Sequence, residues 1–203
     1  KKAILRSFHP DAKSCLVKLG KDEAYQPMEK VHDGGIFAIE VAEKEIPMDR
    51  NYYYKFVFDN NDVYEIVDLY RFTPTLGELD LYYVGEGRHW RIFEKMGAQF
   101  REYQGVKGVS FVVWAPNAKR VSVIGDFNNW DGRLFPLRAM GNSGIWEIFI
   151  PGIKQGALYK FEIISPTGER LEKLDPYAFH TEVRPNTAGH VWDIGQYKWS
   201  DDA

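Results

Sequence analysis

Residues 109–130 read VSFVVWAPNAKRVSVIGDFNNW, and this stretch decides the fold class. Two mostly apolar runs, 109–114 and 121–124, are separated by a short polar segment that contains Pro116. Short runs with apolar residues at every second position, bounded by Pro, Gly, Asn and Asp, are typical of strands. The second run ends in the polar turn 125–132. The stretch therefore predicts two strands of a β-structure.

The same pattern recurs along most of the chain. Turn clusters separate the runs at intervals of about ten to twenty residues, a spacing that favours antiparallel sandwiches over a parallel sheet. A barrel of eight strand–helix units needs at least about 200 residues and alternating helices, which this sequence lacks. Further strands are predicted at 16–19, 36–41, 52–58, 145–150 and 158–163.

An internal repeat accounts for the arrangement of these runs. The matching segments keep their order at offsets of 105 to 109, as loop insertions in two copies of one fold would produce. We therefore expect an all-β chain with two tandem immunoglobulin-like β-sandwiches joined by a short helical connector. The best matches pair residues 8–13 with 114–119, 35–39 with 144–148, and 54–56 with 159–161.

The connector is predicted from a break in the strand pattern between Thr73 and Gly108. Trp90, Phe93 and Met96 recur at every third position ahead of Gly97, which is typical of a two-turn helix closed by glycine. The expected organisation is an N-terminal sandwich at 1–80, a helical connector at 81–104 and a second sandwich at 105–203.

Composition limits the partners. The 203 residues carry a net charge of −3, which argues against nucleic acid and against anionic membrane surfaces. Cys15 is the single cysteine, so neither an intramolecular disulfide nor a zinc site built from thiolates is expected, and a reducing, cytoplasmic compartment fits. We expect neither a membrane span nor a signal peptide, because no apolar run approaches 18 residues and no charged-then-apolar leader opens the given sequence.

The sequence offers no catalytic site. Glycosyl hydrolysis or transfer needs two carboxylates held in a cleft, whereas the carboxylates here fall in turns and at strand edges. The five histidines lack metal-ligand spacing, and the Gly-rich segments 85–87 and 105–108 lack the strand–loop–helix context of a phosphate site. We expect no catalytic residues, no metal and no cofactor.

The turn at 125–132 carries the candidate binding site. Trp130 is a large apolar residue in a polar turn, where its ring either covers the edge of the core or stacks on a sugar. Asn128, Asn129 and Lys160 are the predicted donors to sugar hydroxyls, because stacking supplies area and hydrogen bonds supply orientation. Lys160 alternates with apolar residues in its strand and is therefore expected on the exposed face.

Residues 111–130, together with 144–147, 159–163 and 175–178, resemble the family 48 carbohydrate-binding module of α-glucan-active enzymes. Upstream, residues 85–89 and 93–98 resemble the connector of bacterial-type 1,4-α-glucan (glycogen) branching enzymes. The resemblance implies a non-catalytic N-terminal region of a branching enzyme that acts in glycogen biosynthesis. It implies binding or positioning of α-1,4-glucan for a catalytic barrel that begins just past residue 201.

The resemblance also implies which residues of this chain bind glucan. Relatives that bind glycogen strongly use a turn tryptophan and a strand lysine, which match Trp130 and Lys160. They use a second tryptophan where residues 169–174 here contain no aromatic side chain, which lowers the expected affinity. In the first copy, Tyr25 and Lys55 stand at the corresponding positions and form a second, weaker candidate site.

Three functions stay open at this point. The leading one is glucan binding by a region that is itself inactive, although the parent protein would be a branching enzyme. The second is a structural docking module that braces the catalytic domain without glucan affinity. The third is an independent glycogen-targeting subunit. The expected partners are α-1,4-glucan (glycogen, amylose, maltooligosaccharides) and that catalytic domain.

Overall fold

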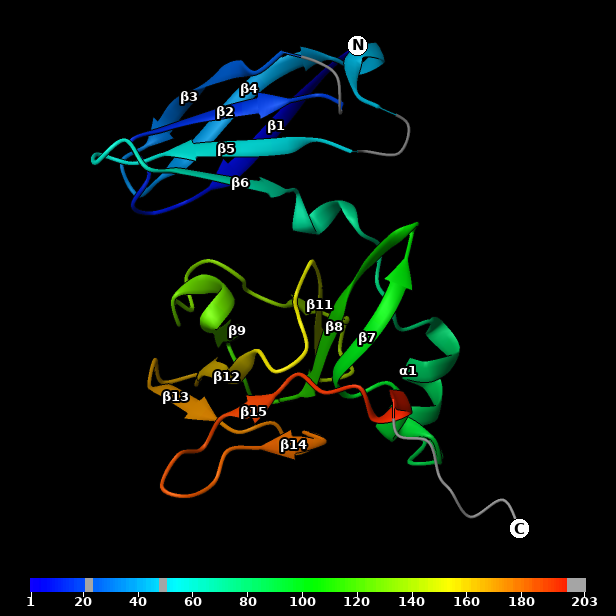
Figure 1. Ribbon diagram of the computed structural model, residues 1–203. Coiled ribbons are helices and arrows are strands. Elements are labelled where there is room, and N and C mark those ends of the chain that lie inside the picture. The colour runs from blue at the N-terminus through cyan, green and yellow to red at the C-terminus, as the bar shows by residue number, and fades with distance from the viewer. Residues whose placement is uncertain (21–23, 48–50, 197–203) are drawn as a thin grey trace. The chain divides into compact units, whose positions relative to one another are not determined.

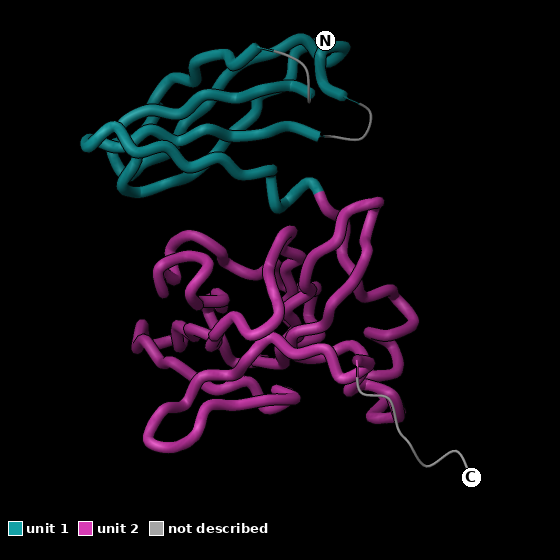
Figure 2. Tube along the Cα trace, in the orientation of Figure 1, with its two compact units in different colours: residues 1–71 teal, residues 72–203 magenta. Residues whose placement is uncertain are grey.

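A computed structural model describes residues 1–20, 24–47 and 51–196. It divides the chain into two compact units, residues 1–71 (unit 1) and 72–203 (unit 2) (Figure 2). The segment past residue 201, where the resemblance implies the start of a barrel, lies outside the described residues.

Unit 1 is an antiparallel β-sandwich (Figure 1). Strands β1, β4 and β3 form one layer and β2, β5 and β6 the other, and β3 joins the layers because it pairs with both β4 and β2. Val17, Phe37 and Phe56 lie in its core. The strands are β1 (Lys2–Phe8), β2 (Ser14–Lys18), β3 (Gln26–His32), β4 (Ile36–Ala42), β5 (Tyr53–Val57) and β6 (Val63–Val67), with 3₁₀ turns at Glu43–Glu45 and Leu69–Arg71.

Unit 2 contains two further antiparallel sheets. One has the order β10-β11-β8-β7, and in the other β12 pairs with β9, β13 and β15. Phe111, Tyr159 and Phe161 are buried between them. The elements are α1 (Glu78–Gly85), β7 (Gly97–Tyr103), β8 (Val106–Trp114), β9 (Arg120–Gly125), β10 (Arg138–Ala139), β11 (Ile145–Pro151), β12 (Leu158–Ile164), β13 (Arg170–Lys173), β14 (His180–Thr181) and β15 (Gly189–His190). Three 3₁₀ turns lie at Ile92–Glu94, Asp126–Asn128 and Ile194–Gln196.

The strand pairing repeats between the units. The pairs β1–β4, β3–β4, β2–β5 and β5–β6 of unit 1 correspond to β8–β11, β10–β11, β9–β12 and β12–β13 of unit 2. The register repeats as well, since Leu5 lies opposite Ile39 and Phe111 lies opposite Ile148. These pairs differ by the sequence offsets 106 and 109. The prediction of two tandem β-sandwiches is confirmed.

The helical connector differs from its prediction. The α-helix is α1, and the segment around Phe93 forms only a 3₁₀ turn. Trp90 is 89% exposed whereas Met96 is buried, so the three-residue spacing does not mark one face of a helix. Residues 81–104 also contain β7, which pairs with β8. This segment therefore belongs to unit 2, and the division between units falls at residue 71.

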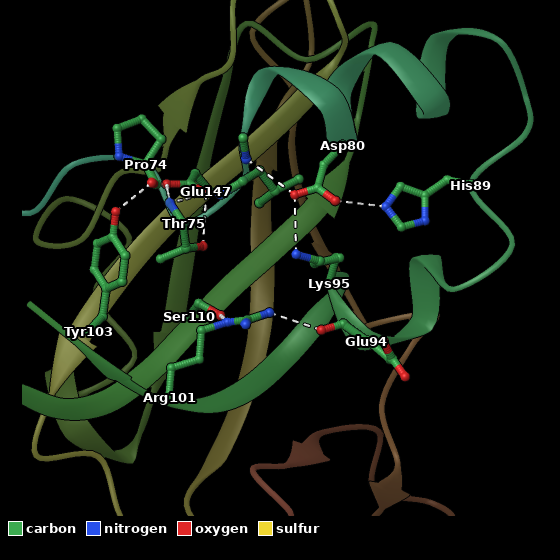
Figure 3. Close-up of polar contacts among 12 residues, drawn as sticks. Pro74, Thr75, Asp80, His89, Glu94, Lys95, Arg101, Tyr103, Ser110 and Glu147 are labelled. Carbon is green, nitrogen blue, oxygen red and sulfur yellow. Dashed lines mark hydrogen bonds and ion pairs between the residues drawn. The ribbon is translucent and has the colours of Figure 1, made fainter.

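One carboxylate joins the segment before α1 to the sheet of unit 2, and a second joins α1 to the segment that follows it (Figure 3). Glu147 of β11, only 1% exposed, accepts hydrogen bonds from the backbone N–H groups of Thr75 and Leu76. Asp80 of α1 accepts a hydrogen bond from His89 (2.9 Å) and pairs with Lys95 (3.2 Å). Burial alone would raise the pKa of Asp80, but hydrogen bonds from His89, the Gly77 backbone and Lys95 lower it below its usual value.

Candidate functional site

The turn after β9 presents Trp130. Gly125 ends the strand where a Cβ atom would lie 2.2 Å from the carbonyl oxygen of Leu158, so glycine is required there. A 3₁₀ turn follows, and then Asn129 and Trp130 both adopt left-handed backbone conformations, with φ of 52° and 59°. Positive φ is unfavourable for a bulky side chain and is found where the surrounding structure imposes it, often at functional sites.

Asn128 has a structural role, contrary to the sequence-based prediction. Its side chain is buried: Oδ1 accepts a hydrogen bond from the Gly125 backbone N–H (2.9 Å), and Nδ2 donates to the Val123 carbonyl oxygen (2.9 Å). Asparagine satisfies backbone groups of tight turns in this way. Asn128 therefore shapes the turn and is not available as a donor to a sugar.

Trp130 and Asn129 line a surface depression of about 370 Å³ in unit 2, which we call the Trp130 depression. Trp130 is half-buried and Asn129 is exposed. The depression holds one large aromatic ring with polar side chains around it, the composition of a site for a polar ligand with an apolar face. Its other lining residues are Arg120, Asp131, Gly132, Arg133, Glu162, Ile164 and Arg170.

Lys160 is not among these lining residues. It lies on β12, opposite Ile124 of β9 and two positions before Glu162. Its side chain is therefore on the same face of the strand as the Glu162 carboxylate. The core-facing neighbours are Tyr159 and Phe161, as the alternation predicts. The structure thus places Trp130 and Asn129 in the same depression. Lys160 lies outside it, two positions before the lining residue Glu162 on β12.

The second candidate site in unit 1 has another composition. Lys55 Nζ lies 5.2 Å from the centre of the Tyr25 ring, and Lys18 Nζ lies 5.0 Å from it. Burial, together with the nearby Glu65 carboxylate, raises the pKa of Tyr25 to about 12. The sequence pairs Tyr25 with Lys55 as the structure does, but the ring already has two ammonium groups nearby.

The charged residues of the Trp130 depression were not predicted from the sequence. Glu162 of β12, whose side chain is 4% exposed, forms ion pairs with Arg120 of β9 (2.8 Å) and Arg170 of β13 (2.7 Å). A Cβ atom on Gly132 would lie 2.1 Å from the Glu162 carboxylate, so the turn packs directly on this side chain. A glutamate two positions after Lys160 in a mostly apolar strand is the one sequence signal that points to it.

The described residues form neither a metal site nor a membrane-spanning helix. Within residues 1–20, 24–47 and 51–196, no group of three or more His, Cys, Asp or Glu side chains is arranged to hold a metal ion. In the same part of the chain, no helix is both long enough and apolar enough to cross a membrane. Cys15 is buried, and burial raises the pKa of its thiol to about 11.

Known proteins resemble this chain at two levels. Residues 95–178 match the family model of carbohydrate-binding module 48, the isoamylase N-terminal domain. The 1,4-alpha-glucan branching enzyme GlgB of Paramagnetospirillum magneticum is 46% identical over 199 residues, and that of Myxococcus xanthus is 46% identical over 202 residues. Each alignment covers 98% of this chain. The chain matches the N-terminal region of the 1,4-alpha-glucan branching enzymes. The resemblance predicted from the sequence is confirmed.

The similarity to the branching enzymes covers only part of their length. This chain spans only 26% and 27% of the length of the two branching enzymes. The carbohydrate-binding module 48 begins at residue 95, ten residues before the predicted boundary, and so includes β7. A Klebsiella pneumoniae pullulanase mutant crystallised with maltotriose aligns with a TM-score of 0.42 and 18% identity, over 94% of this chain and 23% of that chain. The fold assignment rests on the strand pairing described above.

Proposed function

We propose that unit 2 binds α-1,4-glucan, such as glycogen, amylose or a maltooligosaccharide, in the Trp130 depression. In a longer branching enzyme, this would position glucan for chain transfer. The observation that carries the proposal is the left-handed backbone at Asn129 and Trp130, which sets an indole ring at a polar depression within a carbohydrate-binding module 48. A flat ring matches the C–H face of a glucosyl residue, and polar side chains beside it bind the hydroxyls.

The expected affinity is low. One stacked aromatic ring contributes about 1–3 kcal/mol where flat rings carry the contact. With a single platform, we expect a dissociation constant of about 1 mM for maltoheptaose. Lys160, on the same strand face as Glu162, is proposed to contact a neighbouring sugar of a longer chain. Tyr25 and Lys55 are proposed as a weaker second site in unit 1.

Native electrophoresis in gels that contain glycogen tests this proposal. Wild type should be retarded relative to a gel without glycogen, and Trp130→Ala should migrate as it does without glycogen. Trp90→Ala is the matched control, because Trp90 is an exposed tryptophan of the same unit that does not line the depression. Loss of retardation in Trp90→Ala, or its persistence in Trp130→Ala, would contradict the proposal.

A second candidate function, docking to the catalytic part of a longer protein, is favoured by a separate surface. Five large apolar side chains on and after α1 are exposed, and we call them the α1 surface: Leu79, Tyr82, Tyr83, Trp90 and Phe93. Several exposed large apolar side chains within one short segment are typical of an interaction surface. The chain spans about a quarter of its relatives' length, so the remaining three quarters supply the partner.

This second function is tested in a chimera. The N-terminal region of the Paramagnetospirillum magneticum branching enzyme is replaced by this chain, with and without Trp90→Ser. The substitution should lower the melting temperature of the chimera and leave that of the isolated chain unchanged, because Trp90 is exposed there. Equal melting temperatures of the two chimeras would contradict docking through Trp90.

The isolated chain is proposed to be inactive, with its role confined to binding and positioning. A reducing compartment, the cytoplasm, suits its single thiol, since Cys15 is buried and its pKa is raised.

A further inference from the structure

The Trp130 depression contains a carboxylate held between two arginines. Glu162 lies on the central strand β12, with Arg120 on β9 to one side and Arg170 on β13 to the other. Both arginines lie opposite Ile164, two positions beyond Glu162 on the same strand face. The register therefore directs two guanidinium groups to one carboxylate. We call these three residues the Glu162 clamp.

The carboxylate of the clamp is buried, whereas its two arginines are half-exposed. A carboxylate removed from water is stable only when it is paired and hydrogen-bonded. Here Oε1 of Glu162 accepts a hydrogen bond from Arg120 Nη2, and Oε2 forms an ion pair with Arg170 Nε. Gly132 packs against the same carboxylate, so the clamp and the turn that carries Trp130 form one structural unit. Donors and aromatic platform are thereby held at a fixed separation.

The charges around the depression balance. Arg170 also pairs with Glu172 (3.0 Å), and Arg133 pairs with Asp131 (2.6 Å). The three lining arginines are thus paired with three carboxylates, of which Asp131 and Glu162 line the depression and Glu172 lies beside it on β13. A balanced set of charges suits a neutral ligand with many hydroxyls and is unsuited to a phosphate or another anion, which an excess of arginine would favour.

The arginines keep hydrogen-bonding capacity for a ligand. A guanidinium group has five N–H donors in a planar fork, and the ion pairs to Glu162 use Nη2 of Arg120 and Nε of Arg170. The two side chains are 43% and 57% exposed. Nε of Arg120 is buried and Nη2 of Arg170 donates to Glu172, so Nη1 is the nitrogen of each arginine that remains for a ligand. One N–H group from each arginine can donate to one of two neighbouring hydroxyl oxygens on a sugar ring, while the rest of the fork keeps its carboxylate partners.

We propose that Arg120 and Arg170 donate hydrogen bonds to vicinal hydroxyls of the glucosyl residue that stacks on Trp130, and that Glu162 is the positioning residue for both. The inference rests on the proposed glucan binding and deepens it. It gives the donor role, predicted from the sequence for Asn128, to side chains of β9 and β13. The hydroxyls at positions 2 and 3 of an α-1,4-linked glucose are the vicinal pair available.

Calorimetric titration with maltoheptaose tests the proposal. Arg120→Lys and Arg170→Lys keep the charge but lose the fork, and each should weaken binding about tenfold. Glu162→Gln should weaken it to a similar extent, and adding Arg170→Lys to Glu162→Gln should cost little more, because the fork is then already misplaced. Arg88→Lys, an exposed arginine outside the depression, is the matched control and should bind as wild type. Thermal melting of each variant checks that it is folded.

Two further arms identify the ligand chemistry. Wild type should bind β-cyclodextrin at least tenfold more tightly than the derivative methylated at oxygens 2 and 3, and the Arg→Lys variants should lose that preference. Raising sodium chloride from 50 to 500 mM should leave maltoheptaose affinity unchanged within twofold, whereas a steep loss would indicate an anion site and overturn the inference. If Trp130→Ala abolishes binding while folded Arg→Lys variants bind as wild type, the clamp has no donor role and the proposed function stands. If wild type binds no glucan, the proposed function itself fails.

Discussion

Replacing Gly132 by alanine should destabilise unit 2 through a single contact. The added Cβ atom would lie 2.1 Å from Glu162 Oε1 and 2.4 Å from Oε2, whereas real Cβ atoms keep at least 3.0 Å. The carboxylate must therefore retreat by about 0.9 Å, or the turn must move. Glu162 cannot yield freely, because Arg120 and Arg170 hold it at 2.8 and 2.7 Å.

The magnitude follows from these contacts. Overpacking a well-fitted site costs about 1–3 kcal/mol, and breaking a buried ion pair costs about 3–5 kcal/mol. Since the arginines are half-exposed and can follow part of the movement, we expect a loss of about 2–3 kcal/mol in the free energy of unfolding. For a unit of this size, that loss corresponds to a melting temperature lower by about 10 °C. Differential scanning calorimetry measures it directly.

Two variants show whether Glu162 is the cause. Gly85→Ala is the matched control, because a Cβ atom at Gly85 has nothing within 4 Å and the residue lies in α1, where alanine is favourable. It should melt at or slightly above the wild-type temperature. In a Glu162→Ala background, Gly132→Ala should lose most of its cost. If Gly132→Ala melts within 2 °C of wild type, or costs as much without Glu162, the reasoning is refuted.

Three other predictions concern different parts of the chain. Glu147→Ala should leave the backbone N–H groups of Thr75 and Leu76 without their acceptor and cost about 1–3 kcal/mol per buried group; faster hydrogen exchange at these two amides checks it, and unchanged protection contradicts it. The Cys15 thiol, with a pKa raised to about 11, should react with a disulfide reagent at pH 8 only as fast as unit 1 unfolds. Because the folded state holds this proton more tightly than the unfolded state does, the stabilisation is complete below about pH 9 and is lost as pH rises towards 11; stability that does not fall between pH 9 and 11 would contradict it. Finally, incubation of the isolated chain with amylose should form no α-1,6 linkages, and turnover at typical enzymatic rates of about 1 per second or more would overturn the expectation of inactivity.

The fold could be predicted because period and order carry it. The offsets between matching segments reappear in the register of β1 with β4 and of β8 with β11, because strands keep register while loops absorb insertions. The connector could not be predicted in the same way. Met96 is buried beside Leu76, Val112 and Ile145, which are distant in sequence, so its apolar character reflects tertiary packing and not helical periodicity.

The candidate site was predictable in part. A tryptophan in a polar turn identified Trp130, since that residue is unusual there whatever its neighbours. The role of Asn128 was missed because an amide that satisfies its own turn has the same sequence signature as one that faces a ligand. Gly132 and Glu162 are thirty residues apart, and only the folded chain shows that one packs on the other.

Glucan binding through Trp130 is the central claim, and one titration tests it most directly. Maltoheptaose is titrated calorimetrically into the wild-type chain and into Trp130→Ala, with thermal melting to show that both are folded. The account predicts saturable binding by wild type with a dissociation constant of about 1 mM and no measurable binding by the variant. Absence of saturable binding in wild type, or equal affinity of a folded Trp130→Ala, would contradict it.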